Sequence, residues 1–136
     1  MKNSYALVTG ATSGIGLEIS KDLAKRGFNL ILVARTKDKL DSLSSELASE
    51  YNVDCDFFSS DLTLINSPNK IYEYTSQKKY NVNILINNAG YALPNAFHEN
   101  SLEDEEKCLR VLGISVIALT KKYINDMISV SYTHLR

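Results

Sequence analysis

The sequence is poor in the residues that mark several specialised classes of protein. Its 136 residues include no tryptophan, two prolines and two cysteines. Cys55 and Cys108 lie far apart and match no metal-ligand spacing, so we expect two reduced thiols in a cytoplasmic protein. No apolar run approaches the ~18–20 residues of a membrane span, and we expect no signal peptide because residues 1–4 lead directly into the first apolar run. The net charge of −1 gives no overall field that would attract nucleic acid or an anionic membrane.

Short apolar runs alternate with helical patterns along the chain. A chain of this length predicts a single domain with a real core. Strands are predicted over four runs, Tyr5–Thr9, Asn29–Val33, Val53–Phe58 and Val82–Ile86. Strands that alternate with helices of roughly 10–15 residues predict right-handed crossovers. The sequence therefore indicates an α/β fold with a doubly wound parallel sheet of the Rossmann type and strand order 3-2-1-4.

Each predicted helix has an apolar face. The first helix ends at the stop signal Gly27, the second is capped by Thr36, the third begins at Ser67-Pro68 and a long one begins near Ser101. The spacing of apolar residues predicts which positions lie on one side of each helix. These positions are Ile15, Ile19 and Leu23; Leu40, Leu43 and Leu47; Ile71, Tyr74 and Lys78; and Leu109, Leu112, Val116, Leu119, Tyr123 and Met127.

The most informative segment is Thr-Gly-Ala-Thr-Ser-Gly-Ile-Gly at residues 9–16. It follows the first predicted strand and precedes a helix. Glycines in such a turn allow backbone angles that a side chain would block, and they let a diphosphate approach the main chain. The helix N-terminus behind the turn presents unpaired N–H groups and a partial positive charge. The segment predicts a phosphate-binding turn; the alternative is a strand-to-helix connection that needs glycine for geometry alone.

A second motif, Asn87-Asn88-Ala89-Gly90, ends the fourth predicted strand. Ligands of doubly wound sheets bind beyond the carboxyl ends of the strands, near the switch point, which here falls between strands one and four. Both motifs belong to that edge, so we expect the two turns to bind a dinucleotide jointly. In the alternative interpretation, Asn87 and Asn88 serve only as turn formers.

Taken together, the turn at residues 9–16 and the motif at residues 87–90 resemble the short-chain dehydrogenase/reductase family. The resemblance covers nearly all of residues 3–129. It implies that residues 1–129 are the N-terminal part of one dinucleotide-binding domain, whose sheet is incomplete on the C-terminal side. The family performs hydride transfer with a nicotinamide cofactor.

The resemblance also assigns roles to single residues. Gly10 permits the tight turn, Gly14 and Ile15 offer backbone amides to the diphosphate, and Gly16 lets the helix pack close to the sheet. Asp61 would bind the adenine amino group; alternatively it is a turn or cap residue before the next helix. The other residues that the resemblance places at the cofactor are Thr12, Ser13, Leu62, Asn88, Ala89 and Gly90.

The residues after the second strand indicate the choice of cofactor. An NAD-specific site usually places an acid there to bind the ribose 2′-hydroxyl. This chain has Ala34 followed by Arg35, whose guanidinium can bind a 2′-phosphate, so the sequence favours NADP. Alternatively, Arg35 is a solvated charge. Lys37 and Lys39 either add to the positive field or face water.

The catalytic group of the family is expected outside this chain. The family uses a Ser–Tyr–Lys group in which the lysine lowers the tyrosine pKa, and the resemblance places both the serine and a Tyr-x-x-x-Lys signature after a fifth strand. We therefore expect no catalytic residue and no turnover in the chain itself. Leu112 stands where an asparagine usually completes the group, and we interpret it as a packing residue.

Two functions stay open at this point. The intact protein is expected to be an NADP(H)-dependent oxidoreductase that interconverts a small-molecule alcohol and ketone. The alternative is a non-catalytic, redox-sensing protein that binds a dinucleotide on the same fold. Family members often form dimers or tetramers, so the resemblance implies a homo-oligomer for the intact protein. No nucleic-acid, membrane or metal partner is expected.

Three polar segments carry no predicted chemistry. His98 stands alone in a polar loop and is expected on the surface, and the acidic run Glu103–Glu106 suits a solvated helix N-terminus better than a metal site. The last seven residues, Val130–Arg136, are similar to the translation of a common transposon-based sequencing adapter. We therefore expect residues 130–136 to be a non-native tail, and we do not take its Tyr132 and His134 as catalytic candidates.

Overall fold

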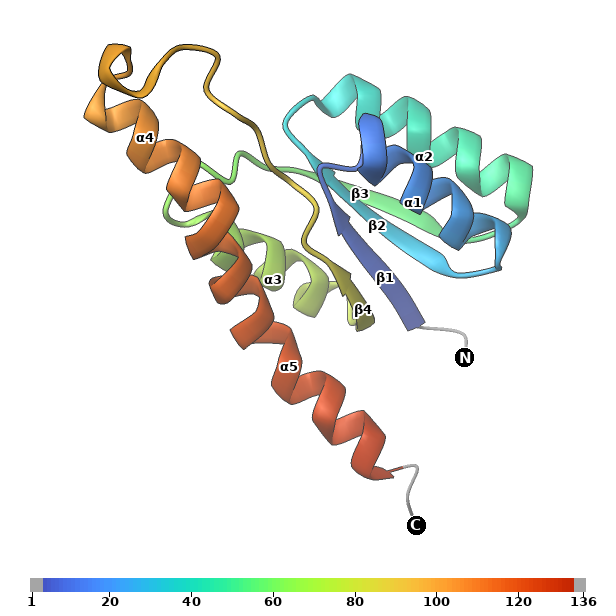
Figure 1. Cartoon of the computed structure of the whole chain (residues 1–136). Coiled ribbons are helices and arrows are strands. Elements are labelled where there is room, and N and C mark those ends of the chain that lie inside the picture. Colours follow the sequence, from blue (N-terminus) through green and yellow to red (C-terminus); the bar gives the residue numbers. More distant parts are fainter. Residues whose placement is uncertain (1–3, 134–136) are drawn as a thin grey trace.

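A computed structural model describes residues 4–133 as a four-stranded parallel sheet with helices on both faces (Figure 1). The strands are β1 (Ser4–Thr9), β2 (Asn29–Ala34), β3 (Cys55–Ser59) and β4 (Asn81–Ile86). They lie in the order β3-β2-β1-β4, which confirms the predicted order. The strands β2 and β3 lie on one side of β1, and β4 lies on its other side. The strand order therefore reverses between β1 and β4, and the switch point lies at the carboxyl ends of these two strands.

The helices connect the strands as crossovers. The three that join consecutive strands are α1 (Gly14–Lys25), α2 (Lys37–Tyr51) and α3 (Ser67–Gln77). After β4 come a short 3₁₀ turn η1 (Phe97–Glu99), α4 (Leu102–Leu109), a π-helical segment η2 (Arg110–Ile114) and the long helix α5 (Ser115–Thr133). Figure 1 shows α1 and α2 on one face of the sheet and α3 and α5 on the other. The doubly wound arrangement is therefore confirmed.

Each face of the sheet has its own apolar core. Successive side chains of a strand point to opposite faces. Ala6 and Val8 of β1 accordingly pack with residues of α1 and α2, whereas Tyr5 and Leu7 pack with residues of α3, η2 and α5. Because both faces are covered, β1 and β2 are almost continuously apolar, as is usual for central parallel strands.

The buried face of α1 differs from the predicted one. The residues that face the sheet are the small Gly16, Ser20 and Ala24, and the Ser20 hydroxyl donates to the Gly16 carbonyl at 2.8 Å. Ile15 is 73% exposed instead of buried. At Gly16 the reason is the start of α1 against the turn after β1, where a Cβ would lie 2.2 Å from the Gly10 carbonyl oxygen.

The apolar stripe predicted for the long C-terminal helix is confirmed at Leu119 and Tyr123 but is wrong at its start. Its buried residues are Val111, Ser115, Leu119 and Tyr123, which follow one another at intervals of four. Leu109 and Leu112, which the spacing places on the apolar stripe, are 62% and 53% exposed. The π-helical segment η2 adds a residue to one turn, and this rotates the helix on one side of η2 relative to the other.

Tyrosines and aspartates are joined by hydrogen bonds at the edge at which the strands begin, here called the amino edge. Asp56 accepts hydrogen bonds from the Tyr74 hydroxyl at 2.6 Å and the Tyr80 hydroxyl at 2.7 Å, and Tyr5 donates to Asp54. Burial and these hydrogen bonds raise the pKa of all three tyrosines. Burial also acts to raise the pKa of Asp56, but the bonds from Tyr74 and Tyr80 outweigh it and hold that pKa below its usual value.

Several smaller predictions can be compared with the structure. His98 is exposed, as predicted, and Cys55 and Cys108 form no disulfide. Burial raises the pKa of the Cys55 thiol to about 12, so this thiol stays protonated. No helix within residues 4–133 is long and apolar enough to cross a membrane. Of the predicted tail, His134 to Arg136 lie outside the described residues, and the boundary near residue 129 stays a prediction.

Candidate functional site

The two glycine-containing turns meet at the carboxyl edge of the sheet, between β1 and β4. Gly10 has a φ of +65°, and a Cβ there would lie 2.9 Å from the Ala89 Cα and from the Asn88 side-chain nitrogen. A Cβ on Gly16 would lie 2.2 Å from the Gly10 carbonyl oxygen. The turns are thus in backbone contact, and both positions require glycine.

Hydrogen bonds from two side chains join the turns. The buried Thr9 hydroxyl accepts hydrogen bonds from the backbone N–H groups of Asn88 and Ala89, each at 3.0 Å. The Asn88 side-chain amide donates back to the carbonyl oxygens of Thr9 at 3.1 Å and Gly10 at 3.3 Å. Asn87 instead donates to the Thr120 hydroxyl of α5 at 3.3 Å. Both asparagines therefore hold the β4 turn in place with their side chains.

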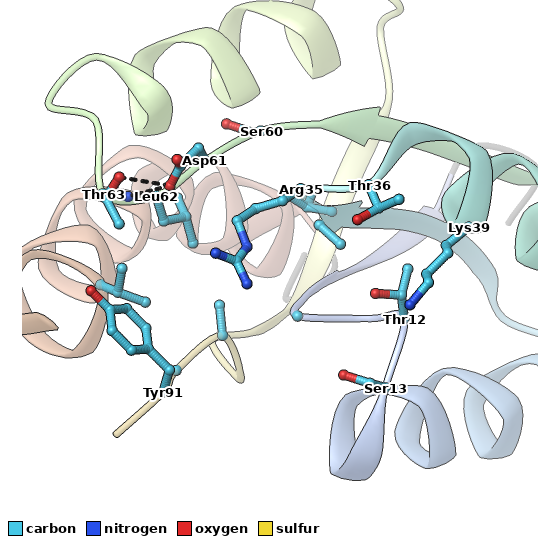
Figure 2. A pocket seen from close by; sticks show the side chains of 16 residues that line it. Thr12, Ser13, Arg35, Thr36, Lys39, Ser60, Asp61, Leu62, Thr63 and Tyr91 are labelled. Atoms are coloured by element: carbon cyan, nitrogen blue, oxygen red, sulfur yellow. Dashed lines mark hydrogen bonds between the residues drawn. The ribbon is translucent and has the colours of Figure 1, made fainter. Parts of the chain in front are cut away.

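Beside these turns lies an open pocket of about 240 Å³ (Figure 2). It is formed by the ends of β1, β2 and β4 and by the segment after β3. Eight of the predicted cofactor-binding residues line it: Gly10, Thr12, Ser13, Arg35, Asp61, Leu62, Ala89 and Gly90. The structure thus places segments from four parts of the sequence around one space at the predicted edge.

Four predicted residues lie outside this lining. Gly16 and Asn88 support the turns from behind, through the close contacts described above. Gly14 and Ile15 line an adjoining groove between α1 and β4, and Ile15 extends its side chain into solvent. The expected role of Gly14 and Ile15 is carried by backbone amides at the start of α1, and it stays a prediction.

Arg35 supplies positive charge at the pocket. It follows β2 directly, and its carbonyl oxygen accepts a hydrogen bond from the Ser59 hydroxyl at 2.8 Å, which fixes the backbone. Figure 2 shows the guanidinium reaching into the middle of the pocket, with Asp61 and Tyr91 on one side and Thr12 and Ser13 on the other. Arg35 forms no ion pair with any residue in the described part of the chain. Its five N–H donors are therefore available to an anion.

Asp61 combines the turn role with a place at the pocket. One carboxylate oxygen accepts hydrogen bonds from the Thr63 N–H at 2.9 Å and the Thr63 hydroxyl at 2.8 Å, which makes Asp61 a turn residue. The same turn orients the carboxylate at the pocket, where Leu62 packs beside it. The Asp61 carbonyl oxygen accepts from the Ser67 hydroxyl, which ties the turn to the start of α3. Binding of the adenine amino group by Asp61 stays a prediction.

One Tyr-x-x-x-Lys spacing does occur within the chain, at Tyr74 and Lys78, but it is not the catalytic signature that is expected after a fifth strand. The structure gives the pair a different role. Tyr74 lies at the amino edge, at the opposite end of the strands from the pocket, and donates to Asp56. Its pKa is raised by burial and by Asp56, the reverse of what a proton-transferring tyrosine near neutral pH requires. Tyr74 and Lys78 are therefore structural.

The remaining acidic segment is structural too. Ser101 caps α4 by accepting a hydrogen bond from the Asp104 N–H at 3.1 Å, and acidic residues fill the first turn, where the helix dipole favours them. Among residues 4–133, no group of three or more histidine, cysteine or carboxylate side chains is placed to hold a metal ion.

Comparison with known proteins identifies the class. The family model for short-chain dehydrogenases matches residues 4–134, so the chain belongs to the short-chain dehydrogenase family, a family of oxidoreductases. A very-long-chain 3-oxoacyl-CoA reductase from Pyrenophora tritici-repentis is 35% identical over 136 residues. That match covers 94% of this chain but only 39% of the reductase.

Solved structures of two further family members have the same fold. A short-chain dehydrogenase from Sphingobium yanoikuyae in complex with NADPH is 30% identical, with a TM-score of 0.86 over 93% of this chain and 49% of that one. A bulky-bulky ketone specific alcohol dehydrogenase from Comamonas testosteroni is 31% identical, with a TM-score of 0.82 over 90% and 49%. The chain thus spans less than half of these relatives.

Sequence reasoning missed several residues of the site. The sequence marks Thr9 only as part of the glycine-rich segment, yet its hydroxyl is the main link between the two turns. Its position at the end of a buried strand, directly before Gly10, is the signal that could have found it, because a buried hydroxyl needs partners. Ser60, Tyr91 and Val111 also line the pocket, and no sequence pattern marked them.

Proposed function

We propose that the pocket binds NADP(H), and that the complete protein uses it to interconvert an alcohol and a ketone. The observation that carries the proposal is the joint wall formed by the two turns, next to Arg35, which forms no ion pair within residues 4–133. Bound NADPH in the Sphingobium relative supports it.

The residues present fit a dinucleotide phosphate. Gly10 lines the pocket, and its lack of a Cβ lets the two turns close against each other as one wall. Behind it, α1 begins at Gly14, which has a φ of +54°; a Cβ added there would meet no atom within 4 Å, so the start of the helix borders open space. The hydroxyls of Thr12 and Ser13 add hydrogen-bond donors beside this helix N-terminus.

Arg35 supports the choice of NADP over NAD. The ribose 2′-hydroxyl of NAD calls for an acceptor such as a carboxylate after β2, and this chain has Ala34 and Arg35 there. A guanidinium instead matches a 2′-phosphate, with two parallel N–H donors. When bound, NADPH would supply the hydride; the residues of the pocket would bind and orient it.

The names of the relatives support a carbonyl substrate. One is a 3-oxoacyl-CoA reductase and another is a ketone-specific alcohol dehydrogenase, and both names describe a ketone and its alcohol. We propose the same reaction type for the complete protein. The chain itself is expected to show no turnover, because its one Tyr-x-x-x-Lys pair lies at the amino edge. Oxidation of NADPH by this chain with any of a panel of ketones would contradict that expectation.

A redox sensor is the second candidate. The observation that favours it is Leu112, which stands in the position of the usual asparagine. It packs against Gly90, since a Cβ added to Gly90 would lie 2.9 Å from the Leu112 Cδ2. The two candidates differ in the gene downstream of this chain. A serine followed about a dozen residues later by Tyr-x-x-x-Lys indicates an enzyme, and its absence indicates a sensor.

Titration with NADPH and NADH tests the binding proposal. We expect NADPH to bind more tightly, and Arg35→Gln to lose roughly tenfold in NADPH affinity with little change for NADH, since one charge-assisted contact is removed. Arg26→Gln is the matched control, because it removes the same charge from the far end of α1, where Arg26 pairs with Asp22. Tighter binding of NADH by the unaltered chain would contradict the proposal.

A further inference from the structure

The π-helical segment η2 contributes to the wall of the pocket. Its Val111 lines the pocket together with Val33 and Leu62, and the three side chains belong to one buried apolar cluster. The next residue, Leu112, reaches the β4 turn, where its Cδ2 lies 2.9 Å from the place that a Cβ on Gly90 would occupy. Figure 1 shows α4 and α5 as parts of one continuous rod, and η2 is the junction between them. Residues of η2 therefore contact both the pocket and one of the turns that form it.

Ser115 makes two hydrogen bonds at the end of this segment. Its N–H donates to the Arg110 carbonyl, five residues back, whereas in an α-helix it would donate to the Val111 carbonyl, four residues back. The Ser115 hydroxyl donates to the Val111 carbonyl at 2.7 Å. The side chain thus gives the Val111 carbonyl the bond that the π geometry takes from it. Because Ser115 is only 2% exposed, water has little access to this bond.

Loss of the hydroxyl would favour a different helical geometry. A buried carbonyl without its donor costs free energy, and the N–H of residue 115 can replace the hydroxyl by returning to the Val111 carbonyl. That change converts the π segment into a regular α-helix. Since each residue of an α-helix turns the chain by about 100°, removal of the extra residue rotates the two sides of the segment relative to each other by about that angle. Val111 and Leu112 would then leave their places at the pocket and at Gly90.

Two other buried serines provide a comparison. The Ser20 hydroxyl in α1 donates to the Gly16 carbonyl at 2.8 Å, and the Ser44 hydroxyl in α2 donates to the Asp41 carbonyl at 2.9 Å. Both serines lie within regular α-helices, where a hydroxyl of this kind adds a second bond to a carbonyl that the backbone pairs. Of these three serines, Ser115 alone stands at a π turn. Its hydroxyl therefore supports a helical geometry that the other two do not need.

We propose that Ser115 is a positioning residue for the cofactor pocket. Its hydroxyl holds η2 in the π geometry, which keeps Val111 at the pocket and Leu112 against Gly90. Ser115 does not line the pocket, so its effect on binding is indirect. The inference rests on the NADP(H) binding proposed above, but its effect on the position of η2 can be measured without a ligand.

The experiment compares the unaltered chain with Ser115→Ala, Ser115→Thr and Ser44→Ala in fluorescence titrations with NADPH. We expect Ser115→Ala to lose about fivefold in NADPH affinity, as for the loss of one buried hydrogen bond. Threonine keeps a hydroxyl that can bond to the carbonyl four residues back, so Ser115→Thr should stay within about twofold of the unaltered chain. Ser44→Ala removes a similarly buried hydroxyl away from the pocket, and it should also stay within about twofold.

A second measurement needs no ligand. In the isotopically labelled chain without NADPH, Ser115→Ala should shift the backbone amide resonance of Gly90, which lies in another segment and contacts η2 through Leu112. Ser44→Ala should leave that resonance in place. An unshifted Gly90 resonance in Ser115→Ala would contradict the proposed role whatever the affinity. Circular dichroism of each variant verifies that it is folded.

The outcomes separate this inference from the proposed function. If the unaltered chain binds NADPH and Ser115→Ala binds it equally well, the role of Ser115 is wrong and the proposed function stands. The same holds if a folded Ser115→Thr loses as much affinity as Ser115→Ala, because the hydroxyl is then not the cause. If the unaltered chain does not bind NADPH, the proposed function is wrong, and the role of Ser115 in cofactor binding is wrong with it.

Discussion

The two edges of the sheet are built from opposite kinds of residue. At the carboxyl edge, glycine-containing turns bring main chain against main chain and leave a pocket of about 240 Å³. At the amino edge, the Tyr5 hydroxyl donates to Asp54, and the Tyr74 and Tyr80 hydroxyls donate to Asp56. The ring centroids of Tyr5 and Tyr80 lie 4.3 Å apart. Small residues thus let two turns meet at one edge, and hydrogen-bonded tyrosines join the elements at the other.

The comparison shows why one residue pattern can have two meanings. A tyrosine followed four residues later by a lysine is the catalytic signature of this family when both reach the cofactor. Here Tyr74 and Lys78 are at the amino edge, where the Lys78 ammonium lies 3.6 Å from Asp56 and 5.5 Å from the Tyr74 ring centroid. Their surroundings raise the tyrosine pKa, so the pair stabilises the fold.

The largest effect on stability is expected from the addition of a single methyl group at the carboxyl edge. Gly16→Ala places a Cβ 2.2 Å from the Gly10 carbonyl oxygen of its own turn and 2.4 Å from the Asn88 side-chain nitrogen of the other turn, so relief of both contacts requires the turns to move apart. We expect the free energy of unfolding to fall by about 3 kcal/mol or more. Chemical denaturation measures the change, and NADPH titration should show a loss of binding.

Gly14→Ala is the control for that experiment. Gly14 has a positive φ, +54°, but an added Cβ would meet nothing within 4 Å. Only the cost of a left-handed backbone applies, about 1–2 kcal/mol. Equal stability of the two alanine variants would contradict the claim that contact between the turns requires glycine at position 16.

A smaller effect is expected from the removal of a hydroxyl at the amino edge. Tyr80→Phe keeps the ring against Tyr5 and removes the hydrogen bond to Asp56. We expect a loss of about 1–1.5 kcal/mol in unfolding free energy, with NADPH affinity unchanged. Tyr72→Phe is the control, because its hydroxyl bonds to Asp126 at an exposed site. A fall in NADPH affinity for Tyr80→Phe would show that the two edges are not independent.

The smallest effect is expected in the pH dependence of stability. Burial and the bond to Asp56 raise the pKa of Tyr80, so the folded state keeps the phenol proton above about pH 10, where an unfolded tyrosine loses it. The folded state then binds more protons than the unfolded state, and stability falls as pH rises beyond that point. Denaturation at about pH 9 and about pH 11 should show a smaller loss for Tyr80→Phe than for the unaltered chain; equal losses would contradict this account.

The order of the sheet and the location of the site could be predicted from the sequence because both depend on local patterns. Apolar runs such as Asn29–Val33 define the strands, and the rule that crossovers are right-handed fixes how they are arranged. Glycine at position 10 is needed for its own φ, so it can be recognised without knowledge of its neighbours. Contact between the turns then follows from the strand order.

The phase of the helices was harder to predict because it depends on distant contacts. Ile15 belongs to an apolar stripe, yet the sheet accepts Gly16 and its small neighbours since α1 begins against the turn after β1. The apolar spacing places Leu112 on the buried stripe, but the π-helical segment turns it toward Gly90 and solvent. No periodicity within one helix contains that information.

The central claim is that both turns at the carboxyl edge bind one dinucleotide. The most direct test is a titration of the isotopically labelled chain with NADP⁺, followed by the backbone amide resonances. We expect shifts in both turns, at residues 10–16 and 88–90, and at Arg35, with none at residues 54–56 and 80 of the amino edge. Shifts confined to one turn, or found at the amino edge, would contradict the claim.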